Sequence, residues 1–514
     1  MPVKPKVLIV NAYVHPWASA TPTQLFIPRA MTPYYLAGQF NREQADIQVY
    51  DEVHHGALLD PGLFAWPDLV VFTGLTAAFD RARQLCAYFR HARPDVITVI
   101  GGPIPRALPV LCDSIFDYVC TGDVEALDQI IAETLGSHCL HEGIPVPRYD
   151  LLGFSYGVGY IETTRYCNFA CSFCSLTGEK RKYTSYSEES IKHQLEALPK
   201  TNVLMLLDNN FYGNHRGNFQ ERVHLLGDYW RRGKYRGWIA LVTGDFFKKE
   251  ANLSLVAENG CIGLFSGVES LDPEVLRNFN KHQSLLSDPK SLSLLCAKYG
   301  IVFDYGVIVD PAQQAIAEID SQINALLADP AIPLPGLLSL TIPIVGTPYF
   351  EDAAQSGRLM PRLRISDLHG QKLVEWPKEP IEQVQPFIAD LLRFRGRKTA
   401  MLKHTLQHTW LRRRSFNLQQ LAFSFMRPVH NFGGTIRIGN LRQMRESWRE
   451  PKLTYNAMTD GLGAMYRPLQ PLPAKFTDYF KPLYVTNAEG GLTDEMINNQ
   501  NPTVTEVPLL PMAV

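Results

Sequence analysis

The stretch GYIETTRYCNFACSFCSL, residues 159–176, decides how the chain is expected to fold and what it holds. It joins an apolar, strand-like run directly to three cysteines, Cys167, Cys171 and Cys174, with the spacing C-x3-C-x2-C. Thiolates are soft ligands that suit iron–sulfur clusters. Three thiolates leave one iron of a cluster open, where the amino and carboxylate groups of a small molecule can chelate. We therefore expect these cysteines to hold such a cluster.

Two other interpretations of the three cysteines are a structural zinc site and a chance grouping of core residues. Structural zinc ligands usually come as two pairs at matching spacings, and no second pair follows here. Nine cysteines in 514 residues are too few for a disulfide scaffold, and in a reducing compartment clustered cysteines are expected to be metal ligands or redox groups. The remaining six stand among apolar neighbours and are expected to be buried small side chains: Cys86, Cys112, Cys120, Cys139, Cys261 and Cys296.

From residue 159 onward, six apolar runs alternate with helical stretches such as SEESIKHQLEAL. The runs are GYIETT, NVLMLLD, GWIALVTG, IGLFSGVES, FDYGVIVD and LLSLTIP. This alternation predicts parallel strands joined by crossover helices. We expect a partial (β/α)6 barrel over residues 159–365, with its site at the carboxyl ends of the strands.

The first part of the chain shows the same rhythm, with the runs KVLIV, IQVYDEV, DLVVFTGL, VITVIGG and FDYVCTG. It predicts a Rossmann-like α/β domain over residues 1–136, which would bind a ligand at the carboxyl edge of its sheet. Residues 137–158 lose the pattern and are expected to be a linker. Residues 366–480 are expected to form a mainly helical domain, and residues 481–514 a poorly ordered tail.

Composition narrows the class of protein. Hydrophobic residues make up 46% and charged residues 20%, and Lys+Arg 50 balance Asp+Glu 51, as in ordinary globular proteins. This balance argues against wholesale nucleic-acid binding. The N-terminal apolar stretch is too short for a signal peptide, and no uncharged apolar run has membrane-spanning length. We therefore expect a cytoplasmic protein.

The cysteine motif and the strands that follow it resemble the radical SAM superfamily. The resemblance implies a [4Fe-4S] cluster, S-adenosylmethionine, and a low-potential electron donor such as flavodoxin or ferredoxin. It also implies reductive cleavage of S-adenosylmethionine to a 5′-deoxyadenosyl radical. The side chains that it places around S-adenosylmethionine are Phe173 at the adenine, Asp208, Asn209 and Asn210 near the methionyl amine, and Glu269 and Ser270 at the ribose. Each polar strand end, taken alone, also fits a helix cap or a solvated loop.

Residues 68–135 resemble the cobalamin-binding domain that precedes the barrel in one radical SAM class, class B. The resemblance lies in three turns, whose residues are expected at cobalamin: Thr73, Gly74, Leu75, Thr76; Gly101, Gly102, Pro103; Gly122 and Glu125. The motif Asp-x-His-x-x-Gly is absent, so no histidine is expected to coordinate cobalt. A degenerate domain that binds no corrin is the alternative, and Glu125 also fits a helix cap.

The resemblance favours a cobalamin-dependent radical SAM methyltransferase that methylates an unactivated carbon of a small molecule, such as an apolar lipid or a tetrapyrrole. The first alternative is a non-methylating enzyme with the same cofactors, such as an oxidative cyclase of tetrapyrrole type. A cobalamin or iron–sulfur sensor is the second. A methylthiotransferase is disfavoured because the cysteines for a further cluster do not fall at the right loops.

Basic and apolar residues alternate over residues 393–414. The pattern fits an amphipathic face with peripheral membrane contact or a site for an acidic substrate, with an ordinary solvated helix as the default. His404 and His408 stand at i and i+4 within it, a spacing that could present two metal ligands on one helical face. Because no carboxylate is nearby in the sequence, we expect a solvated helix there.

Overall fold

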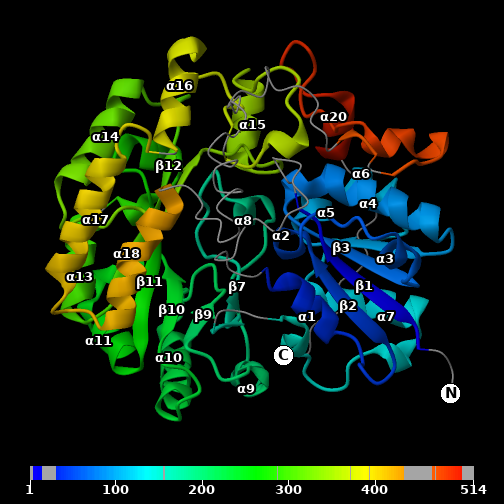
Figure 1. Ribbon diagram of the computed structural model, residues 1–514, viewed down its shortest axis with the longest axis horizontal. Coiled ribbons are helices and arrows are strands. Elements are labelled where there is room, and N and C mark those ends of the chain that lie inside the picture. Colours follow the sequence, from blue (N-terminus) through cyan, green and yellow to red (C-terminus); the bar gives the residue numbers. More distant parts are fainter. Residues whose placement is uncertain are drawn as a thin grey trace.

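The computed structural model describes residues 4–13, 30–153, 157–285, 288–370, 372–392, 394–432, 466–468 and 470–500. Within these residues the chain forms two large parallel sheets and one short two-stranded ribbon. The two sheets stand side by side, with the early part of the chain in one and the middle of the chain in the other (Figure 1).

The first sheet has five parallel strands in the order β2-β1-β3-β4-β5. This is the flavodoxin-like doubly wound order, in which the point where the strand order reverses lies between β1 and β3. The strands are β1 (Lys6–Asn11), β2 (Asp46–Asp51), β3 (Leu69–Thr73), β4 (Ile97–Gly101) and β5 (Tyr118–Cys120). The helices are α1 (Thr32–Gly38), α2 (Glu52–His55), α3 (Pro61–Ala65), α4 (Phe79–Ala92), α5 (Pro103–Ala107), α6 (Pro109–Asp113) and α7 (Leu127–Thr134).

Both faces of this sheet are buried, as expected for strands that are apolar along their whole length. Leu8 and Phe72 belong to a core formed with α4, whereas Val7 and Val71 belong to the core formed with α1 and α7. After this domain, residues 137–153 contain 3-10 turns at Ser137–Cys139 and Tyr149–Leu151 and one isolated β-bridge from Leu140 to Phe40. The five predicted strands and the loss of pattern after them are present in the structure.

The second sheet has six parallel strands in the order β13-β12-β11-β10-β9-β6. Each of the six predicted runs forms one of them: β6 (Val158–Ile161), β9 (Val203–Leu206), β10 (Trp238–Val242), β11 (Cys261–Glu269), β12 (Val302–Val309) and β13 (Leu337–Leu340). Because neighbours in the sheet are successive in the chain, the sheet is a half-barrel rather than a doubly wound sheet. The predicted partial barrel is therefore present.

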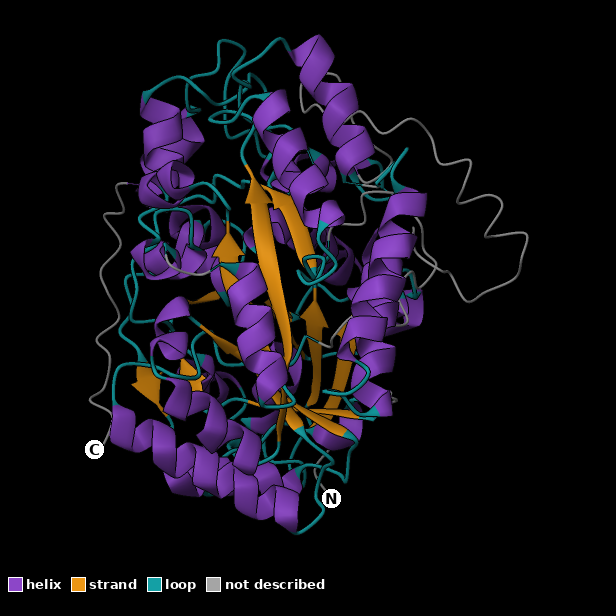
Figure 2. Cartoon of the chain, turned by 90° about the vertical axis from the view of Figure 1, so that its left-hand side faces the viewer, coloured by secondary structure: helices purple, strands orange, loops and turns teal. Residues whose placement is uncertain are grey.

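Helices cover the outer face of the half-barrel, where they stand in front of the strands in Figure 2. They are α9 (Glu188–Ala197), α10 (Arg216–Arg231), α11 (Glu250–Glu258), α13 (Pro289–Lys298) and α14 (Ile316–Ala328). By contrast, α12 (Pro273–Asn278) packs beside Phe173 of the cysteine loop, and α15 (Pro348–Gln355) packs into the core of the first domain. Ser187 caps α9, because its side chain accepts a hydrogen bond from the Ser190 amide. The short helix α8 (Ser175–Gly178) and the ribbon of β7 (Thr164–Arg165) and β8 (Thr184–Ser185) flank the cysteine loop.

The region after the half-barrel divides between the two sheets. Helices α16 (Ile381–Leu391), α17 (Lys398–Arg412) and α18 (Leu418–Phe432) lie beside the half-barrel at the left of Figure 1. The 3-10 helix η9 (Ala474–Phe480) and α20 (Asp494–Gln500) lie against the first domain. The predicted single helical domain therefore splits into two parts that cover different sheets.

Two predictions about this region were wrong. Residues 481–500 are not a loose tail, because Leu483, Val485 and Met496 are buried in the same core as α4. Nor is the histidine face of α17 solvated: His404 and His408 are buried and bond to backbone carbonyl oxygens. In both places a polar-looking stretch buries a few well-spaced side chains. Residues 501–514 lie outside the described residues.

Among the helices of the described residues, none is long and apolar enough to cross a membrane.

Candidate active site

The loop that carries the three cysteines leaves the half-barrel after β6 and is anchored by a buried carboxylate. Asp208, which follows β9, accepts hydrogen bonds from the Thr163 amide at 2.7 Å and from the Thr163 hydroxyl. Burial raises the pKa of Asp208, and the bonds from Thr163 oppose that rise. Because Thr163 engages both carboxylate oxygens, Asp208 holds the start of the loop.

A second contact reaches the interior of the loop. The side-chain amide of Asn210 donates to Asn168 Oδ1 at 2.6 Å, and Asn168 directly follows Cys167. The Asn210 oxygen accepts a hydrogen bond from the Thr243 hydroxyl at 3.3 Å. Asn209, between the two buried residues, is exposed. Of the polar run after β9, one side chain thus anchors the loop, one reaches its interior and one faces solvent.

The three thiols lie in a loop fixed from the side of α12. Cys171 is buried, and the Gln283 side-chain amide donates to its sulfur at 3.3 Å. Asn280 donates to the Ala170 carbonyl at 2.7 Å. Cys167 and Cys174 are half-buried. Hydrogen bonds to cluster sulfurs and their surroundings are a means by which proteins tune iron–sulfur sites.

The thiols also share one electrostatic environment. Burial and the neighbouring Cys171 raise the pKa of Cys167, and they raise that of Cys174 to about 11. The ammonium group of Lys281 lowers both values. Metal ligation requires the thiolate form, which a nearby cation favours. The loop therefore supplies three mutually close sulfurs and one positive charge that suits them.

The arrangement does not match a single-ion site. In the part of the chain that the structure describes, no group of three His, Cys, Asp or Glu side chains is placed to hold one metal ion. A zinc ion draws all its ligands around one centre, whereas an iron–sulfur cluster binds each cysteine to a different iron. Three cysteines that lie near one another suit a cluster, in which each binds a different iron.

A buried ion pair stands at the end of β11, beside the cysteine loop. Lys281 Nζ lies 2.8 Å from Glu269 Oε1, and both side chains are largely buried. Burial alone would lower the pKa of Lys281, but Glu269 raises it, so the ammonium group stays charged. A Cβ on Gly267 would lie 2.1 Å from Glu269 Oε1 and 2.9 Å from Lys281 Nζ, so glycine provides the space for this pair.

Phe173 joins the same group of side chains. Its ring centroid lies 5.0 Å from that of Phe279, and Lys281 Nζ lies 5.7 Å from the Phe173 centroid. Ser270 is buried beside them, but its hydroxyl accepts a hydrogen bond from the Asp272 amide at 3.1 Å. The structure thus brings Phe173 and Glu269 together next to the cysteines, while Ser270 shapes the turn after β11.

The carboxyl edge of the first sheet carries two glycine turns where β1 and β3 meet. A Cβ on Gly74 (φ +159°) would lie 2.7 Å from the Ala12 carbonyl, and one on Gly102 (φ +84°) would lie 2.9 Å from Thr73 Oγ1. These glycines let the turns approach one another closely. Leu75, next to Gly74, is 69% exposed. The edge therefore presents an apolar side chain to solvent at the point where doubly wound sheets bind ligands.

The other predicted residues of this edge form the starts of its helices. Thr76 begins a 3-10 turn, Gly101 ends β4, and Pro103 begins α5. A Cβ on Gly122 would lie 2.4 Å from that of Ala126, so glycine is needed for the turn after β5. These positions explain the turns without a ligand.

Ion pairs join the turn after β5 to the cysteine loop. Glu125 Oε2 lies 2.7 Å from Arg165 Nη1, and Arg165 stands two residues before Cys167. Arg106, after β4, lies 2.8 Å from Asp123 and 2.6 Å from Glu179, which follows α8. Glu125 is therefore an interdomain contact rather than a helix cap. The carboxyl edge of the first sheet faces the cysteine loop.

Several residues of this region were not predicted from the sequence: Lys281, Gln283, Arg106, Arg165 and Glu179. Lys281 and Gln283 lie in a short turn after α12, and only their closeness to a strand-end acid in the sequence could have indicated them. The arginines contact partners far away in the chain, so no local pattern identifies them.

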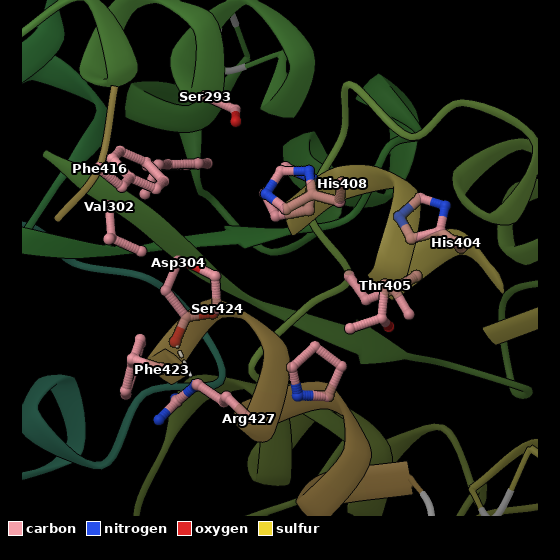
Figure 3. Close-up of a pocket in the computed structure, with 14 residues that line it drawn as sticks. Ser293, Val302, Asp304, His404, Thr405, His408, Phe416, Phe423, Ser424 and Arg427 are labelled. Carbon is pink, nitrogen blue, oxygen red and sulfur yellow. Dashed lines mark ion pairs between the residues drawn. The ribbon is translucent and has the colours of Figure 1, made fainter. Parts of the chain in front are cut away.

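A small pocket of about 30 Å³ lies at the opposite end of β12 (Figure 3). It is lined by Asp304 near the start of β12 and by His404, His408 and Arg427 from α17 and α18. Asp304 and Arg427 form an ion pair, drawn as a dashed line in Figure 3. The pocket has room for one or two water molecules and lies away from the carboxyl edge. It is not the reaction site of the half-barrel.

Comparison with known proteins finds a family match in the middle of the chain. The Radical SAM superfamily matches residues 161–302. Hopanoid C-2 methylase of Rhodopseudomonas palustris is 24% identical over 339 residues, which cover 62% of this chain and 63% of that protein. The chain thus spans less than two thirds of the length of this relative.

Two solved structures resemble the fold. The cobalamin-dependent S-adenosylmethionine radical enzyme OxsB, with aqua-cobalamin and S-adenosylmethionine bound, is 15% identical with a TM-score of 0.57, over 87% of this chain and 75% of that one. The radical S-adenosylmethionine methyltransferase TsrM of Kitasatospora setae is 16% identical with a TM-score of 0.51. The match covers 70% of this chain and 78% of that one. At these identities the likeness concerns the fold.

The residues of the half-barrel fit the cofactors that its family implies. Three thiols share a cationic neighbour, hydrogen-bond donors lie around them, and the aromatic Phe173 stands beside the Glu269–Lys281 pair. Cys167, Cys171 and Cys174 would hold the [4Fe-4S] cluster, and the adjacent strand ends would hold S-adenosylmethionine. Over residues 161–302, the chain therefore carries a Radical SAM domain.

Proposed function

We propose that the chain is a cobalamin-dependent radical SAM methyltransferase that methylates an unactivated carbon of an apolar lipid. The observation that carries the proposal is the placement of the two carboxyl edges. The carboxyl edge of the flavodoxin-like sheet is joined to the cysteine loop by the Glu125–Arg165 and Arg106–Glu179 pairs. A group bound at the first edge would therefore be a neighbour of a cluster held by the second.

The first edge suits a large, flat and partly apolar cofactor. Leu75 offers apolar surface there, and the glycine turns allow close approach of the backbone. His54 and His55 follow β2 rather than the β1–β3 junction, and both make local contacts, His55 accepting from the Asp51 amide at 3.0 Å. We accordingly propose that cobalamin binds without a histidine on its cobalt.

When bound, the cluster supplies the electron for cleavage of S-adenosylmethionine, and cobalamin carries the methyl group. The chain's own residues would position these groups. Phe173 offers a face for the adenine, and Glu269, held by Lys281, offers a carboxylate for the ribose. Asn210 keeps the cysteine loop at its place above the sheet through Asn168. The relative named as a hopanoid methylase supports a polycyclic lipid as the substrate class.

Product analysis tests the proposal. The chain would be purified without oxygen, supplied with iron, sulfide and hydroxocobalamin, and incubated with a low-potential reductant, a hopanoid lipid and S-adenosylmethionine deuterated in its methyl group. We expect deuterated methyl in the lipid, together with both S-adenosylhomocysteine and 5′-deoxyadenosine. The triple variant Cys167→Ala, Cys171→Ala and Cys174→Ala should yield neither product, whereas Cys139→Ala should retain both.

The alternatives give different products. A non-methylating enzyme with the same cofactors would release 5′-deoxyadenosine without S-adenosylhomocysteine, and no deuterium would enter the lipid. A sensor would release neither compound although it bound both cofactors. Iron without cobalt under saturating cobalamin would remove the methylcobalamin route and leave the radical chemistry standing.

A further inference from the structure

Helix α17 carries a row of exposed apolar side chains on its outer face. Leu402, Leu406 and Trp410 stand at i, i+4 and i+8, which places them on one side of the helix. Trp410 is 65% exposed and Leu406 is 54% exposed. Large apolar residues in a continuous row on a surface usually mark a contact with another molecule or a membrane.

The row continues into the turn that joins α17 to α18. Leu411 is exposed, and Leu418, the first residue of α18, is 83% exposed. Between them stand the exposed residues Arg413 and Arg414, and the Arg413 guanidinium lies 4.0 Å from the centroid of the Trp410 ring. A corner of this kind combines apolar side chains with an aromatic ring and cations.

The charge of this region differs sharply from that of the whole chain. The formal net charge of the chain is -1. Residues 391–432, by contrast, contain nine basic residues and no aspartate or glutamate: Arg393, Arg395, Arg397, Lys398, Lys403, Arg412, Arg413, Arg414 and Arg427. Some of these are neutralised by acids elsewhere in the fold, as Arg397 is by Asp320 and Arg427 by Asp304. Lys403, Arg413 and Arg414 remain exposed around the apolar row.

Hydrogen bonds attach the inner face of α17 to the half-barrel, so the outer face is held in a fixed position. The carbonyl oxygens of Leu327 and Ile332 accept from the His404 ring at 3.2 Å and 2.9 Å, and that of Pro330 accepts from His408 at 2.8 Å. Arg412 donates to the Ser293 hydroxyl and to the Ala331 carbonyl, each at 2.9 Å. The helix is thus polar where it meets the half-barrel and apolar where it meets solvent.

We propose that this outer patch docks the chain on an anionic lipid bilayer as a peripheral membrane contact. The patch consists of Leu402, Lys403, Leu406, Trp410, Leu411, Arg413, Arg414 and Leu418. Leucines would enter the acyl boundary, Trp410 would lie at the headgroup level, and the cations would meet lipid phosphates. A nucleic acid would engage the cations but gives exposed leucines nothing to bury against, so the lipid surface fits better.

The inference stands apart from the proposed methyl transfer, since a chain that docks on a bilayer need not methylate. Its test is flotation of the full chain with vesicles of phosphatidylcholine alone or mixed with phosphatidylglycerol. We expect binding to the mixed vesicles that weakens as salt is added. The variant Trp410→Ser with Leu418→Ser should lower the partition coefficient at least tenfold. The variant Arg413→Gln with Arg414→Gln should lose most of the preference for phosphatidylglycerol.

Matched controls separate the patch from general changes in surface. Ile497→Ser removes a 46% exposed apolar residue from α20, and Lys248→Gln with Lys249→Gln removes two adjacent exposed cations. Both controls should float like the unaltered chain. The proposal is overturned if the unaltered chain floats with neither kind of vesicle. It is also overturned if the Trp410 and Leu418 variant floats as well as the unaltered chain. A dimer in solution that this variant converts to a monomer would assign the patch to a second copy of the chain, and would overturn it too.

Discussion

Tyr166, the residue before Cys167, donates a hydrogen bond from its hydroxyl to Asp123 in the turn after β5. The Tyr166 backbone has φ +63°, a conformation that is uncommon for a residue with a side chain. The first domain therefore helps to hold an unusual backbone position directly in front of the first cysteine. Loss of this contact should therefore destabilise both domains.

The first prediction concerns the charge at the centre of this interface. Burial would raise the pKa of Asp123, but the Tyr166 hydrogen bond and the arginines lower it, so the group is a carboxylate that faces several cations. Asp123→Ala leaves Arg106 and Arg165 without this partner. We expect a loss of about 2 kcal/mol in the free energy of unfolding, with a lower midpoint in thermal unfolding.

A matched aspartate shows whether the loss is specific to the interface. Asp150 pairs with Arg148 at 2.7 Å, but its side chain is 57% exposed. Asp150→Ala should therefore cost less than about 1 kcal/mol. Equal losses for the two variants would show that the Asp123 contacts do no more than an ordinary surface pair.

The second prediction concerns the apolar tip of the first sheet. Leu75→Glu places a carboxylate where we propose that the corrin lies, and burying that charge is costly. We expect at least a tenfold weaker affinity for hydroxocobalamin, measured by equilibrium dialysis, with iron content unchanged. Leu337→Glu, at an exposed leucine that begins β13, should leave both values unchanged. Unaltered cobalamin binding by Leu75→Glu would place the cofactor elsewhere or remove it.

The third prediction concerns the cation beside the thiols. A positive charge close to a cluster stabilises its reduced, more negative form, so Lys281→Met should make the cluster harder to reduce. We expect the midpoint potential to fall by on the order of 50 mV in a redox titration followed by electron paramagnetic resonance. The double variant Lys281→Met with Glu269→Gln removes both charges and should recover most of the shift. A fall that the double variant does not recover would contradict a charge effect.

The sequence was sufficient to predict most of the architecture. Each of the six runs from GYIETT to LLSLTIP forms a strand of the half-barrel, because parallel strands buried on both faces leave long apolar runs. The position of the three cysteines after β6 followed from the same pattern. The residues that follow each strand could also be placed at the carboxyl edge, since all strands of a parallel sheet end at one side.

The hydrogen-bond partner of each polar side chain at that edge could not be predicted. Asp208 and Asn210 stand two residues apart, yet one bonds to Thr163 and the other to Asn168. Lys281 reaches Glu269 because the chain folds back after α12. No pattern in the neighbouring sequence indicates this tertiary contact. The segment 481–500 was taken for a tail because it is polar, although a few spaced apolar residues suffice to bury it against α4.

The final prediction rests on a buried group of acids above β12. The Tyr349 hydroxyl lies 2.9 Å from Asp310 Oδ2 and 3.0 Å from Glu375 Oε2. One hydroxyl hydrogen cannot be donated fully to two oxygens, so the group favours a proton on one of the carboxyls. Burial and the charge of Asp310 together raise the pKa of Glu375 to about 7, against the opposing effects of Tyr349 and Arg358.

This shift makes stability depend on pH in a definite direction. Between the ordinary value of 4.5 and about 7, the folded chain keeps a proton on Glu375 that the unfolded chain releases. The free energy of unfolding attributable to this group should therefore fall as pH rises through that window, by up to about 1.4 kcal/mol per pH unit. Glu375→Gln should remove this part of the slope in thermal unfolding at a series of pH values. Asp352→Asn, which alters the 70% exposed partner of the same Arg358, should leave the slope in place, and a slope that persists in Glu375→Gln would assign the proton to another group.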